Sequence, residues 1–319
     1  MKNISPKDTD LSLSAIGFGT AAFGLRESLD GENADRILEG YVAGGGNLID
    51  TAHVYSDWIP GEKSRSERVV GDWIRRRGGH SDVVIMSKCC HPNPATMDVS
   101  RLSEKDLIED VNGSLEKLGV DCIDIYVYHR DDESRPVAEL IEQMEKIKKQ
   151  GKIRYYACSN WHTDRMRQAE KYCEEKGYRG FILNQAMYNI GTAGMAPPSD
   201  KTIVVCDKEM LDYHKNSKTL LVPFSGGCSG FFHRLKSMGA DALRKSGYYS
   251  ERNLKIAEGL FKLCEDKQCS ITAGLMGFFS TADFDMLPLS SAEDMEQLDC
   301  IVEALKQDFT KEDFAFCRF

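Results

Sequence analysis

Short apolar segments alternate with longer amphipathic segments along almost the whole chain. The run at residues 83–88 has the length and continuous apolar character of a strand that is covered on both faces. In other segments apolar side chains recur at intervals of three and four, as at Val69, Val70, Trp73 and Ile74, and this spacing predicts a helix. The alternation is typical of βα units that build a parallel sheet.

The pattern predicts strands at residues 15–19, 48–52, 83–88, 123–129, 153–158, 181–184, 219–224 and 286–289. It predicts helices at residues 32–43, around 69–74, and at 103–119, 136–151, 163–176, 207–215, 251–264, 271–279 and 292–305. Eight strands joined by right-handed crossovers close into a (β/α)8 TIM barrel, an α/β fold of about 250 residues or more. Because no charged or low-complexity linker divides the chain, residues 1–319 are expected to form a single domain.

Composition narrows the classes of partner. The chain has 41 basic and 50 acidic residues, a net charge of -9 and no long basic run, so nucleic-acid binding is not expected. No segment approaches the roughly 18 uninterrupted apolar residues of a membrane span, and residues 1–10 lack the apolar core of an export signal. The 11 cysteines are scattered singly, apart from Cys89 and Cys90, which is typical of reduced thiols in a cytoplasmic protein. A small-molecule substrate is expected, and nothing in the sequence indicates an oligomeric state.

Four polar residues follow consecutive predicted strands. Asp50 and Tyr55 follow the second strand, Lys88 ends the third and His129 ends the fourth. In a barrel of this type the active site lies where the strands end, so the fold brings all four to one rim. Each residue alone has an ordinary structural explanation, but four together indicate a catalytic site.

Proton delivery to a carbonyl oxygen, while a hydride reaches the carbonyl carbon, is the chemistry that suits these side chains. Tyrosine has an ordinary pKa of about 10, and a neighbouring Lys88 ammonium would lower it. Asp50 would hold Lys88 in place, and His129 would donate a hydrogen bond that orients the substrate oxygen. The sequence therefore predicts reversible reduction of an aldehyde or ketone to an alcohol, with Tyr55 as the general acid.

Several motifs carry a family resemblance over nearly the whole chain. The most specific is Gly46-Asn47-Leu48-Ile49-Asp50-Thr51-Ala52-His53-Val54-Tyr55. Further matches lie at residues 13–20, 66–71, 114–119, 124–129, 151–154 and 159–160. Through these motifs the chain resembles the aldo-keto reductase family, which implies an NAD(P)-dependent carbonyl reductase or alcohol dehydrogenase with Asp50, Tyr55, Lys88 and His129 as its catalytic tetrad.

The resemblance also implies a cofactor site. Ser159, Asn160 and Gln185 would hold the nicotinamide carboxamide, and Phe224 would stack on the ring. The glycine-rich turn at residues 225–230 would wrap the pyrophosphate, in agreement with the usual position of phosphate sites in barrels. The complete set of implied cofactor residues is Gly19, Thr20, Asp50, Ser159, Asn160, Gln185, Phe224, Ser225, Gly226, Gly230, Ser290 and Ser291.

The choice between NADP(H) and NAD(H) depends on the segment that opens the last helix. Family members that prefer NADPH usually carry a basic residue there, whereas residues 289–298 contain three acids and no Lys or Arg. Ser290 and Ser291 could still donate hydrogen bonds to a phosphate near a helix N-terminus. NADP(H) is expected from the family, with NAD(H) as the alternative.

Other interpretations stay open at this point. The chain could be a regulatory subunit that binds the cofactor and turns over little substrate. A metal-dependent hydrolase would use Cys89, Cys90 and His91 with His53 or His129, although packed thiols and a loop histidine explain these residues better. Trp58, in a charged loop, could form a wall of the substrate pocket.

Overall fold

The computed structural model describes residues 3–317 and contains a sheet of eight parallel strands in the order β7-β6-β5-β4-β3-β2-β1-β8. The strands are β1 Gly17–Gly19, β2 Leu48–Asp50, β3 Val84–Cys89, β4 Ile123–Tyr128, β5 Ile153–Ser159, β6 Leu183–Gln185, β7 Leu220–Leu221 and β8 Leu289–Ser290. A parallel bridge between Leu221 and Met286 closes the circle, supported by a hydrogen bond from the Leu287 amide to the Leu221 carbonyl (3.0 Å). The predicted (β/α)8 barrel is therefore confirmed.

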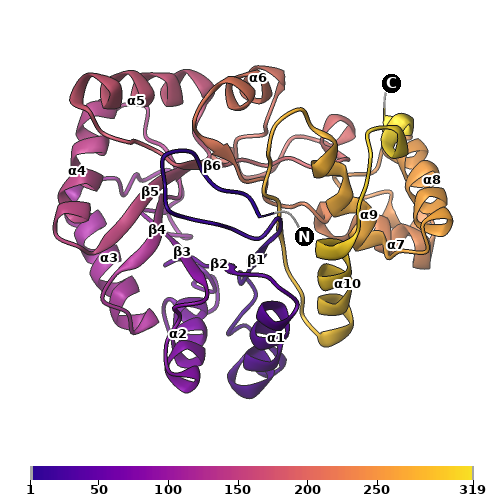
Figure 1. Ribbon diagram of the computed structural model, residues 1–319, viewed down its shortest axis with the longest axis horizontal. Coiled ribbons are helices and arrows are strands. Elements are labelled where there is room, and N and C mark those ends of the chain that lie inside the picture. Colours follow the sequence, from indigo (N-terminus) through magenta and orange to yellow (C-terminus); the bar gives the residue numbers. More distant parts are fainter. Residues whose placement is uncertain (1–2, 318–319) are drawn as a thin grey trace.

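Helices surround the strands (Figure 1). They are α1 Gly31–Ala43, α2 Arg65–Arg77, α3 Glu104–Leu118, α4 Val137–Lys149, α5 Thr163–Lys176, α6 Lys208–Asn216, α7 Phe231–Met238, α8 Glu251–Asp266, α9 Ile271–Gly277 and α10 Met295–Lys306. The last α-helix, α10, packs against α1, next to the first strand. Their capping follows the sequence: the Ser103 hydroxyl accepts from the Asp106 amide at the start of α3, and Gly119 ends that helix at a φ of 67°.

Several predicted boundaries differ from those of the structure, and one α-helix was missed. Pro136 is the residue before α4 rather than part of its first turn. The last helix begins at Met295 because Asp294 caps it, accepting from the Gln297 amide. The eighth strand lies at Leu289–Ser290, and residues 286–288 precede it, with Met286 pairing with β7 through a single bridge. Helix α7 was not predicted, because its short apolar start follows directly on the glycine-rich turn.

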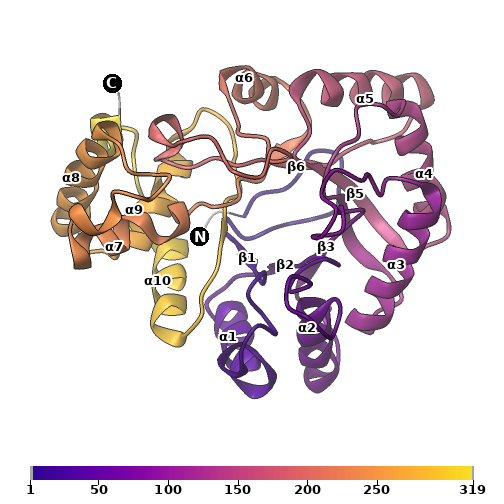
Figure 2. The same cartoon turned by 180° about the vertical axis from the view of Figure 1, so that it is seen from behind.

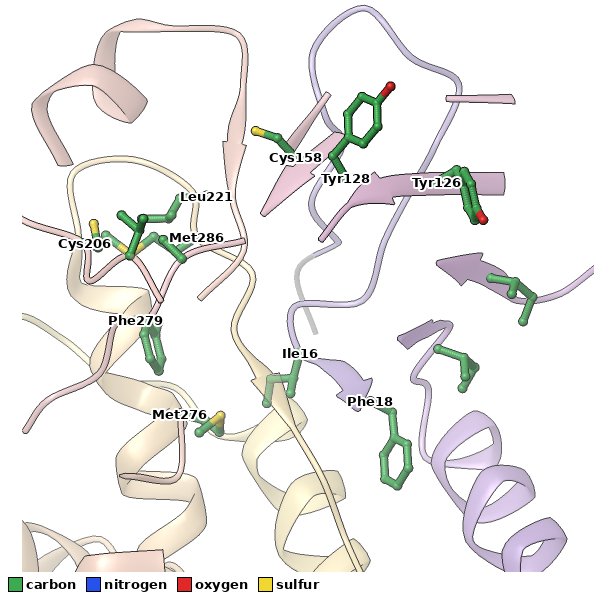
Figure 3. Close-up of a cluster of buried hydrophobic side chains, with 14 of the residues drawn as sticks. Ile16, Phe18, Tyr126, Tyr128, Cys158, Cys206, Leu221, Met276, Phe279 and Met286 are labelled. Atoms are coloured by element: carbon green, nitrogen blue, oxygen red, sulfur yellow. The ribbon is translucent and has the colours of Figure 1, made fainter. Parts of the chain in front are cut away.

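The buried side chains form two layers. Along β4, Tyr126 and Tyr128 point outward and pack under the helices, whereas Ile125 and Val127 point into the barrel. Figure 3 shows part of the outer layer, where Phe18, Tyr126 and Tyr128 come from the strands and Met276 and Phe279 come from the α9 region. This separation follows from the two-residue period of a strand, which sends successive side chains to opposite faces.

An N-terminal hairpin covers the end of the barrel at which the strands begin. The Ile4 amide donates to the Leu13 carbonyl (2.7 Å), and the Leu13 amide donates to the Ile4 carbonyl (2.8 Å). The side chains of Ile4, Leu11 and Leu13 are buried with the inner layer. The hairpin crosses in front of the strands in Figure 1 and lies behind them in Figure 2, so the opposite end is the one left open for a ligand.

A helix that spans a membrane must be both long and apolar. None of the helices within residues 3–317 combines the length and the apolar character that a bilayer crossing requires.

Candidate active site

The barrel brings the four predicted catalytic residues to its open rim. Asp50 is the last residue of β2, Lys88 lies in β3, and His129 follows β4. Beyond β2 the backbone stays hydrogen-bonded to β3, since the His53 amide donates to the Lys88 carbonyl (3.0 Å). A turn then carries Tyr55 back over Lys88, with the Tyr55 amide donating to the Ala52 carbonyl (3.1 Å).

Lys88 is the centre of this arrangement. Its fully enclosed Nζ donates to Asp50 Oδ2, to the Thr51 carbonyl and to the Tyr55 hydroxyl, each at 2.8 Å. On the other side of the carboxylate, Gln185 Nε2 donates to Asp50 Oδ1 (2.8 Å). A buried ammonium needs a counter-charge and acceptors for its three protons, and this site supplies both.

The pKa shifts define which group holds the proton. Burial acts to lower the pKa of Lys88, but Asp50 and Tyr55 outweigh it and raise this pKa, so the ammonium stays charged. Burial raises the pKa of Tyr55 although Lys88 opposes the rise. The expected net lowering of the Tyr55 pKa is therefore not found, because desolvation of the phenolate is the larger effect. Tyr55 is protonated at neutral pH, as a general acid must be before it donates.

His129 is neutral in this environment. Burial lowers its pKa well below the ordinary value, and Arg130, His91 and Lys88 act in the same direction. Its Nδ1 is enclosed and has no hydrogen-bond partner among the described residues. We assign the single proton to Nε2, because this tautomer leaves a lone pair rather than an unpaired N–H in the enclosed position. The His129 ring lies 5.7 Å from that of Tyr55, centroid to centroid, which suits a donor that shares a substrate oxygen with the tyrosine.

A cavity of about 730 Å³ opens above these side chains. Such a volume is within the range of small-molecule and cofactor sites, about 300–1,000 Å³. Of the residues predicted for the site, its lining contains Gly19, Asp50, Tyr55, His129, Ser159, Asn160, Gln185, Phe224, Ser225, Gly226, Gly230, Ser290 and Ser291. Lys88 lies behind this lining and reaches it through Tyr55 and Asp50. Thr20 also lies behind it, where its hydroxyl donates to the Asp50 carbonyl (2.9 Å).

At the end of the cavity where the nicotinamide carboxamide is predicted to bind, polar groups of the protein already hydrogen-bond to one another. Asn160 has a left-handed backbone, with φ at 60°, and its Nδ2 donates to the His129 carbonyl (3.2 Å) and to Ser159 Oγ (3.0 Å). Asn160 Oδ1 accepts from the Val204 amide (3.0 Å). Asn160 thus ties together the chain segments after β4, β5 and β6, and it leaves the hydroxyl proton of Ser159 available for a ligand.

The turn at residues 225–230 forms a cradle at the other end. Ser225 and Ser229 have φ values of 59° and 50°, so the backbone coils tightly before α7. A Cβ at Gly226 would lie 3.1 Å from the Leu289 carbonyl oxygen, so a larger residue would crowd the turn against β8. A glycine-rich turn that leads into the start of α7 suits a pyrophosphate, and the donor set of the whole cavity fits a nicotinamide dinucleotide.

The structure adds lining residues that the sequence did not indicate. Arg234 and His233 come from the unpredicted helix α7, and Thr272 comes from α9. At the same end, Glu293 forms an ion pair with Arg26, which partly neutralises the acidic start of the last helix. The Phe231-Phe232 pair after the glycine-rich turn was the available signal for α7, and with it for a cation next to the cavity.

A second cavity of about 750 Å³ adjoins the first. Tyr55, His129 and Arg130 line both, so these three side chains lie between the two spaces. Trp58 lines the second cavity and is 52% exposed, in keeping with its suggested place as a wall of the substrate pocket.

No three His, Cys, Asp or Glu side chains converge as metal ligands within residues 3–317. Cys89 and Cys90 are buried, and burial raises the pKa of both thiols, which disfavours the thiolate that binds metals. The geometry gives the metal-dependent hydrolase no support.

Fold and site together define a TIM-barrel protein with a buried Asp, Lys, Tyr and His group at the end of a dinucleotide-sized cavity. The model of the aldo/keto reductase family matches residues 15–318, and the chain belongs to this family.

Known proteins similar to this chain include enzymes and a channel subunit. An NADH-specific methylglyoxal reductase from Escherichia coli is 28% identical, with 100% of this chain and 98% of the relative covered. An NADP(+)-dependent aryl-alcohol dehydrogenase from Phanerodontia chrysosporium is 24% identical, with 98% and 82% covered. A probable voltage-gated potassium channel subunit beta from Arabidopsis thaliana is 31% identical, but the match spans 56% of this chain and about half, 53%, of the relative.

Among solved structures, a thermostable aldo-keto reductase in complex with the inhibitor epalrestat has a TM-score of 0.73. It is 20% identical in sequence, and the match covers 99% of this chain and 98% of the other. This likeness supports the fold.

Proposed function

We propose that this protein is a nicotinamide-dependent oxidoreductase that reduces aldehydes or ketones to alcohols, reversibly, with Tyr55 as the general acid. The observation that carries the proposal is the Lys88 Nζ, which donates at 2.8 Å to both Asp50 and the Tyr55 hydroxyl. Enzymes of the family act on small molecules, and two of the relatives are named as a reductase and a dehydrogenase.

The nicotinamide, when bound, supplies the hydride for the carbonyl carbon. Tyr55 donates its proton to the carbonyl oxygen, and the adjacent Lys88 ammonium stabilises the phenolate that remains. Asp50 keeps Lys88 charged and in position. Neutral His129 donates from Nε2 to the same carbonyl oxygen and so orients it toward Tyr55. In the oxidative direction the phenolate of Tyr55 accepts the proton of the alcohol.

The proposed cofactor contacts follow the cavity. The Ser159 hydroxyl and the Gln185 side chain hold the carboxamide, Phe224 stacks on the nicotinamide, and the turn at residues 225–230 binds the pyrophosphate. Ser290, Ser291 and Arg234 line the adenosine end, where Arg234 offers the cation that a 2'-phosphate requires. NADP(H) therefore remains the proposed cofactor, with NAD(H) as the alternative that the NADH-specific relative favours.

A panel of aldehydes and ketones tests the proposal, with nicotinamide absorbance followed for NADPH and NADH separately. We expect turnover with both nucleotides and a lower KM for NADPH. A large advantage for NADH would overturn the cofactor choice. Full reductase activity in Tyr55→Phe would overturn the mechanism.

A regulatory subunit with the same fold is the second candidate function. It is favoured by the relative named as a probable channel beta subunit, whose match includes 56% of this chain. Such a subunit would bind the nucleotide tightly without appreciable carbonyl reduction, whereas the complete Asp50, Lys88, Tyr55 and His129 group supports an enzyme.

The setting of the reaction completes the proposal. We place the protein in the cytoplasm, as its scattered cysteines led us to expect, with a small-molecule carbonyl compound rather than a nucleic acid or a membrane as its partner.

A further inference from the structure

Arg130 is a buried charged residue that lines the candidate site and that the proposed mechanism does not use. Arg130 is 8% exposed and directly follows His129. It lines both the first cavity, proposed for the cofactor, and the second cavity, proposed for the substrate. Burial removes water from the guanidinium of Arg130 and lowers its pKa, but the group keeps its positive charge. A charge retained beside the reacting atoms is a candidate for substrate binding.

Three of the five N–H groups of this guanidinium donate within the protein. Nε donates to Thr202 Oγ1 (2.6 Å), Nη1 to the His129 carbonyl (2.9 Å) and Nη2 to Asp200 Oδ2 (3.1 Å). The second N–H of each terminal nitrogen has no acceptor among the described residues. Two donors are thus free on a group held rigidly from three sides, at the boundary of the two cavities.

The charges around the second cavity decide which acceptor suits these donors. Arg130 and Lys201 contribute two positive charges, and Asp98 and Asp200 contribute two negative ones. His91 is neutral, because burial and Arg130 lower its pKa to about 4. The lining is therefore balanced, and the carboxylate of Asp200, bound to the same guanidinium, would repel a carboxylate ligand. A neutral carbonyl oxygen can accept from the free N–H groups without displacing Asp200.

The position of Arg130 sets where that oxygen lies on the substrate. Arg130 lines both cavities together with Tyr55 and His129, and it lies close enough to Tyr55 to oppose the rise in the pKa of that phenol, so its free donors lie near the proposed reacting group. The rest of the cavity is walled by Val54, Trp58 and Met97, which suit an apolar remainder.

We propose that Arg130 selects vicinal dicarbonyl compounds, by donating to the carbonyl oxygen on the carbon next to the one that is reduced. This inference rests on the proposed carbonyl reductase function and names its substrate class. Asp200 and Thr202, from the loop after β6, act as positioning residues that aim the guanidinium.

Diacetyl and butanone form a matched pair of probes, since they differ by one carbonyl oxygen. Dicarbonyls are intrinsically more reactive, so the quantity to compare is the ratio of kcat/KM values in the wild type and in Arg130→Met. A hydrogen bond to a charged donor is lost for diacetyl alone, and we expect this ratio to fall about 10- to 100-fold in the variant. Arg130→Lys, which keeps the charge but loses the planar fork, should lie between the two.

Two controls separate recognition from structure. Arg167→Met removes an exposed arginine that pairs with Glu209 on a neighbouring helix, away from both cavities, and should leave the ratio unchanged. Methyl pyruvate and pyruvate distinguish a neutral acceptor from a carboxylate, and the loss in Arg130→Met should be larger for the ester.

Equal losses for diacetyl and butanone in both Arg130 variants would overturn the inference, since a purely structural arginine would have that effect. A larger loss for pyruvate than for methyl pyruvate would also contradict it. Binding of diacetyl to the NADP-bound protein, followed by tryptophan fluorescence because Trp58 lines the cavity, tests the inference without turnover. Binding of diacetyl that depends on Arg130, with no reduction of any carbonyl compound, would refute the proposed function but support the Arg130 binding site. Reduction of carbonyl compounds with a selectivity that does not depend on Arg130 would support the proposed function but refute the inference.

Discussion

The two ends of the barrel interior differ in chemistry within two residues along β2 and β3. In β2, Leu48 is packed in the inner apolar layer and Asp50 is in the ion pair with Lys88. In β3, Met86 and Lys88 show the same succession. One end is closed by an apolar hairpin, and the other buries charges that have been paired. The difference teaches that the apolar end of the barrel supplies stability. This stability allows the rim to hold charged groups that are costly to bury.

The largest expected effect is on chemistry at the polar end. Tyr55→Phe removes the proposed proton donor and should lower kcat about 100- to 10,000-fold, the usual contribution of a general acid. Steady-state kinetics with a saturating aldehyde measure this. Tyr155→Phe is the matched control, because Tyr155 donates to Asp10 Oδ1 (2.9 Å) at the opposite end of the barrel. Equal losses of kcat in Tyr55→Phe and Tyr155→Phe would contradict the assignment of the chemistry to the polar end of the barrel.

The next effect concerns stability at the apolar end. Leu13→Ala removes a fully buried side chain of the hairpin and should lower the free energy of unfolding by about 2–5 kcal/mol. Urea denaturation measures the change, and Val99→Ala, at a residue that is 54% exposed, is the control. We expect kcat/KM of the folded Leu13→Ala protein to stay at the wild-type value. A stable variant with impaired turnover would contradict the division of roles.

The polar end should also make the protein sensitive to acid. The pKa of His91 is lowered to about 4 by burial and by Arg130, from 6.5, so the unfolded chain takes up the proton first as the pH falls. His91 thus contributes stability above pH 6.5 that is lost as the pH falls toward 4. Because the ring is partly exposed, we expect a loss of roughly 1–3 kcal/mol that His91→Asn does not show. Parallel curves of unfolding free energy against pH for both proteins would refute this account.

The smallest effect is expected at the proposed carboxamide contact. Ser159→Ala removes a hydroxyl whose proton is available to the cofactor, and KM for NADPH should rise about fivefold, which corresponds to one ordinary hydrogen bond. The exposed Ser134 provides the control, as Ser134→Ala. An unchanged KM in Ser159→Ala would remove this residue from the cofactor site.

The sequence predicted the barrel and the convergence at its rim because both follow from periodicity and from the direction of the strands. Asp50, Lys88 and His129 lie at or next to the ends of three consecutive strands, and parallel strands end on the same side. The hairpin at residues 4–13 was not predicted, since it pairs through one bridge and has no repeating pattern. The same limit applies to Arg234 and Arg130, whose places depend on a short helix and on loop contacts. The balance between burial and Lys88 at Tyr55 is a sum of opposing effects that spacing alone does not give.

Deuterium transfer tests the central claim most directly. The protein is incubated with a carbonyl substrate and NADPH that carries deuterium at the transferable position of the nicotinamide, and the alcohol is analysed by mass spectrometry. We predict that the deuterium is found on the carbinol carbon and that Tyr55→Phe slows its incorporation by the same factor as turnover. A protein that binds NADPH yet produces no deuterated alcohol would contradict the account and favour the regulatory subunit.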